Sequence, residues 1–314
     1  VCDTAAPADP AGDHPPILSP IDLQCVKAAG VTFAVSALER VIEERARGDA
    51  DAAQGIRGDL EARIGGGIRS VKPGSAEAAA LKAALIEAGM WSQYLEVAIG
   101  PDAEIFTKAP VLSTVGWGSD VGIRSDSSWN NPEPEIVVVA TSDGRVVGAT
   151  LGNDVNLRDF EGRSALLLGK AKDNNASTGI GPFIRLFDGD FTMDTVRDAV
   201  VDLQIDGPEG YVLTGTSTMR EISRDPEDLV RQALSEHQYP DGFVLFLGTL
   251  FAPVQDRDEP GRGFTHKPGD VVRISTPSLG ELANTVTTSK AADPWGFGIR
   301  DLMRNLSRRG LIAA

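Results

Sequence analysis

The chain has 314 residues, of which 41% are hydrophobic and 24% charged, and its 45 acidic and 30 basic side chains give a formal charge of −15. This composition is that of a globular protein with one large core or two unequal ones, and its negative field repels phosphate backbones and anionic lipids, so nucleic acid and membranes are not expected partners. No segment has the ~20 consecutive apolar residues that a bilayer span needs, and the beginning lacks the pattern of a signal peptide, which makes the cytoplasm the expected location.

The first part of the chain, residues 1–94, is expected to be an irregular beginning followed by helices. Residues 1–30 are rich in Pro, Asp and Ala and are predicted to be an extended or loop segment with little regular structure. Apolar residues recur at helical spacing over residues 31–48, and a second helix is predicted from Ser75 to Gly89, with a shorter helix and a loop between the two. The charged side chains expected on the other side of the first helix are Glu39, Glu43, Glu44 and Arg47. Because the chain begins with Val and not Met, this part is expected to be truncated.

The second part, residues 95–314, has the short apolar runs divided by Gly, Pro, Asp and Ser that are typical of a mostly β domain. Residues 136–140 and 145–151 flank a Ser-Asp-Gly turn and are predicted to form a hairpin. Further strands are expected near the segments GYVLTG, GFVLFLG and DVVRIST, and a helix over 226–236 follows an Asp-Pro pair.

Three acidic residues lie around the predicted hairpin. Glu133 and Glu135 are two apart at the beginning of its first strand, so their side chains share a face, and Asp154 follows the second strand, which returns the chain to the same place. Carboxylates that lie close together repel one another unless a proton or cation compensates them, and oxygen ligands without His or Cys favour Mg²⁺, Mn²⁺ or Ca²⁺. From spacing alone, a solvated acidic strand end and loop is the alternative.

Cysteine and histidine offer no competing site. Cys2 and Cys25 have no neighbouring ligand pattern, so neither a disulfide framework nor a thiolate zinc site is expected. His14, His237 and His266 are not spaced to pair with another candidate ligand, which argues against a histidine metal site.

The motifs around the carboxylates resemble the fumarylacetoacetate hydrolase family over roughly residues 100–290. The matching segments are FTKAP (106–110), PEPEIVVV (132–139), GNDVNLRD (152–159), AKDNNASTGIGP (171–182), DGFVLFLGT (241–249) and HKPGDVVRISTPSLGELANTV (266–286). The resemblance implies an α+β fold with a rolled, mixed β-sheet and a smaller helical N-terminal part, and a homodimer or dimer of dimers. It places the family's metal ligands on Glu133, Glu135 and Asp154, with Mg²⁺ as the expected cofactor and Mn²⁺ or Ca²⁺ as possible substitutes.

The resemblance also identifies residues that contact the substrate, a small 2-keto acid. The family's site lysine falls on Lys172 and not on Lys170, because Lys172 keeps the family's distance to the Gly181-Pro182 pair. A lysine there would stabilise negative charge on the substrate oxygen. Thr249 matches a family threonine that looks like a substrate contact. Without the resemblance, a solvated lysine and an ordinary strand threonine are the alternatives.

The residues before the first metal ligand bear on the reaction. Family hydrolases that cleave carbon–carbon bonds in diketo acids usually carry a His there, paired with a further Glu, to activate water. Asn130, Asn131 and Pro132 occupy that place, and none of them can act as a general base at neutral pH. The segments SSWNNPEPE, GTSTM and EIFTKAP look more like the sugar-acid branch, whose members dehydrate 2-keto-3-deoxy sugar acids.

The hypothesis is therefore a metal-dependent hydro-lyase that converts a 2-keto-3-deoxy-pentonate, derived from D-xylonate or L-arabinonate, to 2-oxoglutarate semialdehyde by enolate formation and loss of the C4 hydroxyl. Glu104 is the candidate for proton transfer, with Lys108 near the substrate; an exposed Glu/Lys pair at a strand edge is the alternative. Ser217, and also Ser127 or Ser128, are candidates for contacts with the distal hydroxyls.

Two other functions stay open. One is a hydrolase of acylpyruvates or 2,4-diketo-3-deoxy sugar acids, which would need a base from elsewhere in the chain. The other is an inactive ligand-binding relative that keeps the fold and the metal site.

Overall fold

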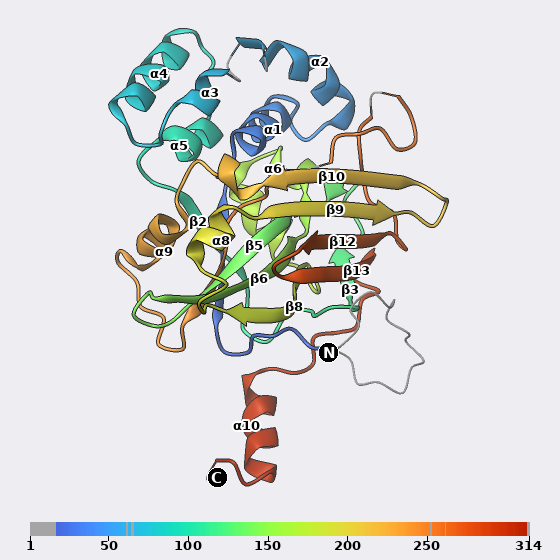
Figure 1. Cartoon of the computed structure of the whole chain (residues 1–314). Helices are drawn as coiled ribbons and strands as arrows, with labels where there is room; N and C mark the ends of the chain where they lie inside the picture. The colour runs from blue at the N-terminus through green and yellow to red at the C-terminus, as the bar shows by residue number, and fades with distance from the viewer. Residues whose placement is uncertain (1–16, 61, 64–65, 252, 261, 313–314) are drawn as a thin grey trace.

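The structure, a computed structural model, describes residues 17–60, 62–63, 66–251, 253–260 and 262–312 (Figure 1). Cys2 and His14 lie outside the described residues. Within the described part, strands form sheets of six, five and two strands, and five helices gather at one end of the molecule. None of the described helices has both the length and the apolar character that a membrane crossing requires.

The N-terminal part begins with a strand, β1 (Cys25–Gly30), which corrects the expectation that residues 1–30 have little regular structure. β1 pairs in parallel with β11 (Phe243–Phe246) and antiparallel with β2 (Glu104–Ala109). The parallel partner, β11, lies more than two hundred residues away in sequence. The local composition of residues 1–30 therefore gave no indication of a strand.

The helices that follow β1 agree in part with the prediction. Their bounds are α1 (Ala34–Arg45), α2 (Ala50–Leu60), α3 (Gly66–Ser70), α4 (Ala76–Glu87) and α5 (Gln93–Ile99). α1 and α4 are the two predicted helices, and the Ser75 hydroxyl accepts a hydrogen bond from the Ala78 amide at 3.1 Å, which caps α4 as expected. Two helices, and not one, lie between them. Glu39 and Glu43, expected on a polar side of α1, are buried instead.

The six-stranded sheet has the order β2-β1-β11-β5-β6-β8. Its remaining strands are β5 (Pro134–Ala140), β6 (Val146–Asp154) and β8 (Thr178–Leu186). The predicted hairpin is confirmed by the antiparallel pairing of β5 with β6. At its turn the Thr141 amide donates to the Arg145 carbonyl at 3.0 Å, and Gly144 takes a φ of 84°, which glycine adopts without strain.

The five-stranded sheet has the order β10-β9-β12-β13-β3. Its strands are β3 (Asp120–Ile123), β9 (Val200–Asp206), β10 (Val212–Thr218), β12 (Val271–Thr276) and β13 (Gly280–Thr288), and the small sheet pairs β4 (Asn130–Asn131) with β7 (Asn156–Leu157). The remaining helices are α6 (Arg158–Glu161), α7 (Leu168–Lys172), α8 (Met193–Arg197), α9 (Pro226–Leu234) and α10 (Ile299–Arg308), with short 3-10 turns at Ala165–Leu167 and Met219–Glu221. The expected strands β10, β11 and β12 and the expected helix α9 are all present.

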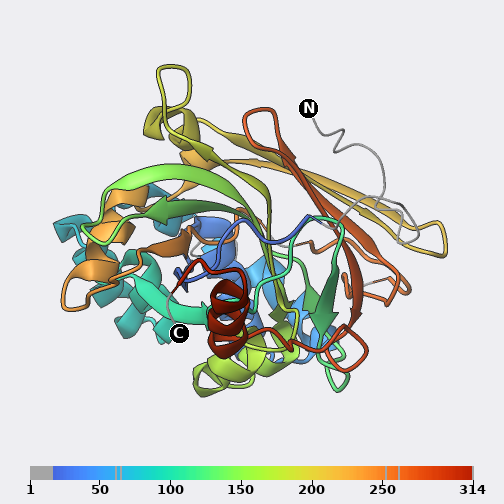
Figure 2. The same cartoon turned by 90° about the horizontal axis from the view of Figure 1, so that it is seen from below.

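The largest core joins the two large sheets, which lie around a common interior (Figure 2). Ile136 and Leu151 reach it from the first sheet, and Leu203 and Ile274 reach it from the second. A separate core holds the helical part together. The architecture is therefore the expected α+β fold, with mixed sheets and a helical N-terminal region whose helix α1 lies next to the beginning of β5.

Candidate functional site

The three carboxylates that the sequence singled out meet at one place. Glu133, Glu135 and Asp154 are 2%, 1% and 1% exposed, and their carboxylate ligand atoms lie within 4.8 Å of one another. β5 carries Glu135 at its beginning, β6 ends with Asp154, and the Asp154 amide donates to the Glu133 carbonyl at 3.0 Å. The predicted convergence is confirmed, and the alternative of a solvated acidic loop is wrong.

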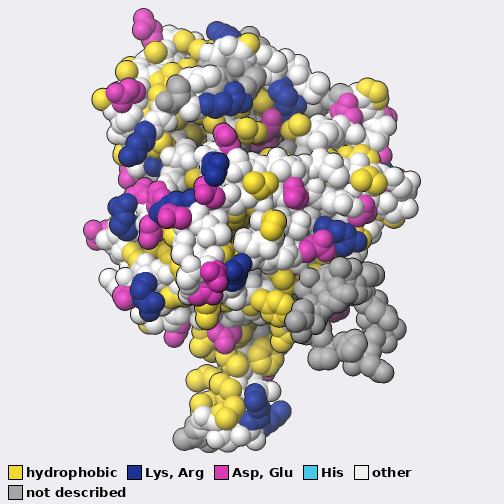
Figure 3. All heavy atoms as spheres, viewed as in Figure 1, with side chains coloured by type: hydrophobic (Ala, Val, Ile, Leu, Met, Phe, Trp, Pro, Cys, Tyr) yellow, Lys and Arg dark blue, Asp and Glu magenta, His cyan; other side chains and the backbone are white. Residues whose placement is uncertain are grey.

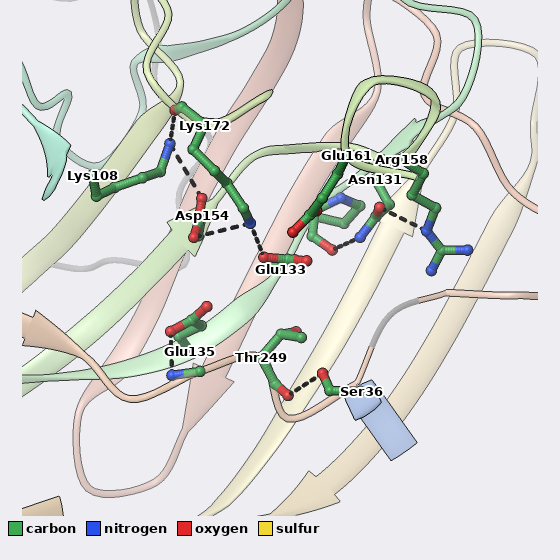
Figure 4. A network of polar contacts seen from close by, with 12 residues as sticks. Ser36, Lys108, Asn131, Glu133, Glu135, Asp154, Arg158, Glu161, Lys172 and Thr249 are labelled. Carbon is green, nitrogen blue, oxygen red and sulfur yellow. Dashed lines mark hydrogen bonds and ion pairs between the residues drawn. The ribbon is translucent and has the colours of Figure 1, made fainter. Parts of the chain in front are cut away.

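Two lysines enter the same cluster (Figure 4). The Lys172 ammonium, at the end of α7, lies between Glu133 and Asp154; it pairs with Glu133 and lies 3.1 Å from Asp154 Oδ2. The Lys108 ammonium, from β2, lies 3.2 Å from Asp154 Oδ1 and donates to the carbonyl of Ser177 at 3.0 Å. Both lysines are buried, so neither is the solvated side chain that was the alternative.

Burial and mutual repulsion shape the protonation of these groups. Burial raises the pKa of Glu135 well above its usual range, and the neighbouring Asp154 and Glu133 raise it further. Burial opposes the charged form of Lys172, but Asp154 and Glu133 outweigh burial and raise the pKa of this lysine. Burial lowers the pKa of Lys108, with Asp154 opposing the change. The cluster thus favours additional positive charge beside Glu135.

A second layer of charge lies behind Glu133 and was missed by sequence reasoning. Arg40 of α1 pairs with Glu133 and Glu43, and its guanidinium lies 3.2 Å from Glu161 Oε2. Arg158 of α6 approaches Glu43 at 3.3 Å. No local pattern of α1 indicated this layer, because its charged residues lie opposite its apolar face and are buried there by groups that are distant in sequence.

Glu104 reaches the pocket from β2, on the same side of the strand as Lys108, four residues further on. Burial raises the pKa of Glu104 to about 7, and the nearby Glu161 contributes to the increase. Glu104 lies opposite Gly30 of β1, and a Cβ added at Gly30 would lie 2.1 Å from its Oε2 atom. The glycine therefore provides the space that the Glu104 carboxylate occupies.

A pocket opens over the cluster. Its lining is Ala29, Gly30, Val31, Ser36, Arg40, Glu104, Phe106, Glu133, Glu135, Asp154, Glu161, Lys172 and Thr249. The Thr249 hydroxyl donates to the Phe251 carbonyl at 2.9 Å, and the Thr249 carbonyl accepts from the Ser36 hydroxyl at 3.2 Å. The structure thus brings Thr249 to the same pocket as the predicted metal ligands.

The three candidate serines do not line this pocket. The Ser217 hydroxyl donates to the Leu250 carbonyl at 3.3 Å, one residue from Thr249. The Ser127 hydroxyl donates to Asp159 at 2.9 Å, and the Ser128 amide donates to the same carboxylate. Their contacts with a substrate stay a prediction.

The Asn-Asn-Pro segment before Glu133 is engaged in structural hydrogen bonds. The Asn131 side chain donates to the Pro132 carbonyl at 2.8 Å and accepts from Arg158 at 2.9 Å. The Asn130 side chain accepts from the His266 amide at 3.2 Å. Of the histidines that the structure describes, none lines the pocket, and the titratable side chains that line it are five carboxylates, one lysine and one arginine.

Comparison with known proteins places these motifs in a known family. The profile described as Fumarylacetoacetate (FAA) hydrolase C-terminal matches residues 78–287, which is more than half of the chain. This match begins before residue 94, where the sequence predicted the boundary between the two parts, and that boundary stays a prediction.

Two curated proteins are similar to the chain. It is 31% identical over 205 residues to a probable 2-keto-3-deoxyxylonate dehydratase of Haloferax volcanii, with 64% of this chain and 66% of that protein covered. It is 33% identical over 190 residues to a 2-dehydro-3-deoxy-D-arabinonate dehydratase of Saccharolobus solfataricus, with 58% of each protein covered. The chain thus spans less than two thirds of the length of either relative.

One similar solved structure was determined with ligands. It is a 2-keto-3-deoxy-D-arabinonate dehydratase complexed with magnesium and 2,5-dioxopentanoate. Its identity to this chain is 30%, its TM-score is 0.55, and the match covers 63% of this chain and 66% of that chain.

Proposed function

Because the chain belongs to the fumarylacetoacetate hydrolase family, we propose that it is a Mg²⁺-dependent dehydratase of a 2-keto-3-deoxy-pentonate. The two curated relatives are named for this reaction on xylonate- and arabinonate-derived substrates. The 2,5-dioxopentanoate of the similar solved structure is 2-oxoglutarate semialdehyde, the product that the proposal assigns to this chain.

The residues of the cluster fit a divalent cation. Asp154 Oδ1 is buried without a hydrogen-bond partner, although Lys108 lies nearby. The charged groups of the site and of the layer behind it are Glu43, Glu104, Glu133, Glu135, Asp154 and Glu161 against Arg40, Lys108, Arg158 and Lys172. Six carboxylates face four cations, and two negative charges are left for a divalent ion to compensate when all ten groups are ionised. Oxygen ligands of this kind suit Mg²⁺, with Mn²⁺ or Ca²⁺ as possible substitutes.

The side chains around that site have distinct tasks. A bound Mg²⁺ would supply Lewis acidity toward the carboxylate and 2-keto oxygen of the substrate, which makes a C3 proton more acidic. The Lys172 ammonium stabilises the negative charge that develops on the keto oxygen when that proton leaves. Lys108 holds Asp154 in place. The Thr249 hydroxyl, which donates to the Phe251 carbonyl, is proposed to accept a hydrogen bond from the substrate at the pocket wall.

Glu104 is the proposed proton-transfer residue. It removes the C3 proton, and in its protonated form it delivers a proton to the C4 hydroxyl, which leaves as water; a later proton shift from C5 then yields the aldehyde. A carboxyl whose pKa is about 7 is suited to both directions of transfer near neutral pH. The task falls to a carboxylate because Asn130 and Asn131 occupy the place of the hydrolase histidine.

The observation that carries the proposal is this combination: three buried carboxylates with Lys172 between two of them, and no described histidine at the pocket. The test is product identity. The purified chain, incubated with Mg²⁺ and 2-keto-3-deoxy-pentonate, is expected to form 2-oxoglutarate semialdehyde. The product is measured by its oxidation with a coupled semialdehyde dehydrogenase.

Each other outcome of this test has a defined meaning. Pyruvate formed from an acylpyruvate or a 2,4-diketo-3-deoxy sugar acid, followed with lactate dehydrogenase, would replace the dehydratase by the hydrolase. Mg²⁺ binding without turnover of the 2-keto-3-deoxy-pentonate, the acylpyruvate or the 2,4-diketo-3-deoxy sugar acid would identify an inactive ligand-binding relative.

A further inference from the structure

The C-terminal segment leaves the body of the molecule as an arm, defined here as residues 293–312 (Figure 1). The Asn175 side chain fixes its root by donating to the carbonyls of Ser289 at 3.2 Å and Asp293 at 3.0 Å. Beyond this point no residue of α10 is buried. Among the described residues, no side-chain hydrogen bond or ion pair joins α10 to the body; its one ion pair, Asp301 with Arg304, is internal.

One side of the arm is apolar. Ile299, Leu302, Met303 and Leu306 follow one another at helical spacing, so they form a single stripe along α10. Trp295 and Phe297 precede them and are 47% and 46% exposed. Figure 3 shows these hydrophobic side chains gathered below the body.

A helix of this kind needs a surface to pack on. α10 has ten residues, fewer than the ~12–15 at which isolated helices become even marginally stable in water. Most of the stability of such a helix comes from burial of its apolar stripe. Among the described residues, Ile299 and Met303 of this stripe are 51% and 57% exposed, whereas Leu302 and Leu306 are half-buried. The exposed part of the stripe is therefore available to pack on another molecule.

The charge of the arm indicates which kind of molecule it packs on. Between Ile299 and Arg309 the arm carries four arginines and one aspartate, whereas the whole chain has a formal charge of −15. A basic arm is therefore attached to an acidic body, and a second copy offers the complementary surface. An anionic membrane would attract the arm but repel the body that carries it.

We propose that the arm is an interaction element between copies of this chain, with the apolar stripe of α10 packed on the acidic body of a second copy. Apolar side chains that an arm can cover are present there. Phe183 and Leu186 of β8, the outer strand of the six-stranded sheet, are 50% and 63% exposed. This inference is independent of the proposed reaction.

A pair of matched charge substitutions in the full chain tests it. Leu302→Asp puts a carboxylate on the apolar stripe, and Asn305→Asp puts the same charge on the exposed polar side of α10. In sedimentation equilibrium the native chain is expected to associate, and Leu302→Asp is expected to raise the dissociation constant at least about tenfold, since loss of a packed leucine costs more than 1.4 kcal/mol. Asn305→Asp is expected to leave it within about twofold, as surface substitutions do.

Amide hydrogen exchange provides a readout at the arm itself. Exchange over residues 299–308 is expected to be slow in concentrated native protein and to accelerate on dilution. A native chain that stays monomeric, an unchanged dissociation constant in Leu302→Asp, or exchange that is independent of concentration would each overturn the proposal. Co-sedimentation of the native chain with phosphatidylserine–phosphatidylcholine vesicles, lost in Leu302→Asp, would assign the arm to a membrane instead.

Discussion

At the scale of single residues, substitution of Lys172 tests whether its ammonium stabilises the negative charge that develops on the substrate. Its ammonium lies between Glu133 and Asp154, inside the pocket. We expect Lys172→Met to lower kcat about 10²- to 10³-fold, because a preorganised cation at a developing oxyanion contributes on this order. Mg²⁺ binding, measured by calorimetry, is expected to persist, since the substitution removes positive charge and leaves all three carboxylates.

Lys170 is a matched control for this prediction. It lies two residues earlier on α7 and is exposed, so Lys170→Met removes the same charge outside the pocket. The Lys170 variant is expected to retain native kcat within about twofold, as surface substitutions usually do. Equal losses in the two variants would show that Lys172 has no specific role.

Gly30 controls the position of Glu104. A Cβ at Gly30 would lie 2.1 Å from Oε2 of Glu104, the far end of a flexible side chain, so the carboxylate would move while the strand stays in place. We expect Gly30→Ala to slow proton exchange at C3 by about 10²-fold, because catalysis is sensitive to displacements near 1 Å. Exchange of the pyruvate methyl protons into D₂O, followed by NMR with Mg²⁺ present, measures this step.

Gly58 provides the comparison for that experiment. A Cβ at Gly58 of α2 would have no neighbour within 4 Å, so Gly58→Ala is expected to leave the exchange rate unchanged. The melting temperature of Gly30→Ala is also expected to stay close to native. Native exchange in Gly30→Ala would mean that Glu104 is not the group that moves the C3 proton.

At the scale of elements, a buried cluster joins the segment before β12 to the turn between β9 and β10. The Arg257 guanidinium donates to both oxygens of Asp270, at 2.6 and 2.7 Å, and also reaches Glu209 at 3.0 Å. His266 Nδ1 lies 2.9 Å from the same carboxylate, which also accepts from the Lys267 amide. Asp270 thus holds one end of β12 to two loops.

This cluster predicts acid sensitivity of the fold. Burial lowers the pKa of His266 below its ordinary 6.5, although Asp270 opposes the change, so the unfolded chain binds a proton that the folded chain does not. The free energy of unfolding is therefore expected to decrease as pH falls below about 6.5, by up to ~1.4 kcal/mol per pH unit. Burial alone would raise the pKa of Asp270, but Arg257, His266 and the Lys267 amide lower it to about 2, which adds a loss of stability below pH 3.8.

Urea denaturation at several pH values, with two histidine variants, tests this prediction. His266→Asn keeps a side-chain N–H near Asp270 and removes the titrating ring, so the pH slope just below 6.5 is expected to flatten. His237 is exposed, and His237→Asn is expected to keep the native slope. A slope that is unchanged in His266→Asn would assign the acid sensitivity to other groups.

The elements differ in how far the sequence determines them. The β5–β6 hairpin was predictable because its turn and both strands are adjacent, and the same adjacency brought Glu135 and Asp154 together. β1 was not predictable, because this short strand lies in a Pro-rich segment and forms by pairing with β11, which is far along the chain. The burial of Arg40 and Glu43 depends on Glu133, Glu161 and Arg158, which no local pattern of α1 contains.

At the scale of the whole molecule, the site connects parts of the chain that are distant in sequence. Glu135 and Asp154 come from the six-stranded sheet, Lys172 comes from α7, and Arg40 comes from the helical N-terminal region. An ion held by these carboxylates would bind the folded chain and not the unfolded chain, which has no assembled site. Its binding would therefore shift the folding equilibrium toward the folded chain.

Mg²⁺ is therefore expected to stabilise the entire fold. At a free concentration of 100 times the dissociation constant, binding to the folded state alone adds about 2.7 kcal/mol to the free energy of unfolding. Thermal unfolding in EDTA and in Mg²⁺ measures the shift, at matched ionic strength, because the chain carries a formal charge of −15.

In Glu135→Gln the Mg²⁺-dependent shift is expected to vanish. The stability of this variant in EDTA is expected to be at least that of the native chain, since burial, Asp154 and Glu133 all disfavour the Glu135 charge. A full Mg²⁺ shift in that variant would contradict the assignment of Glu135 as a ligand.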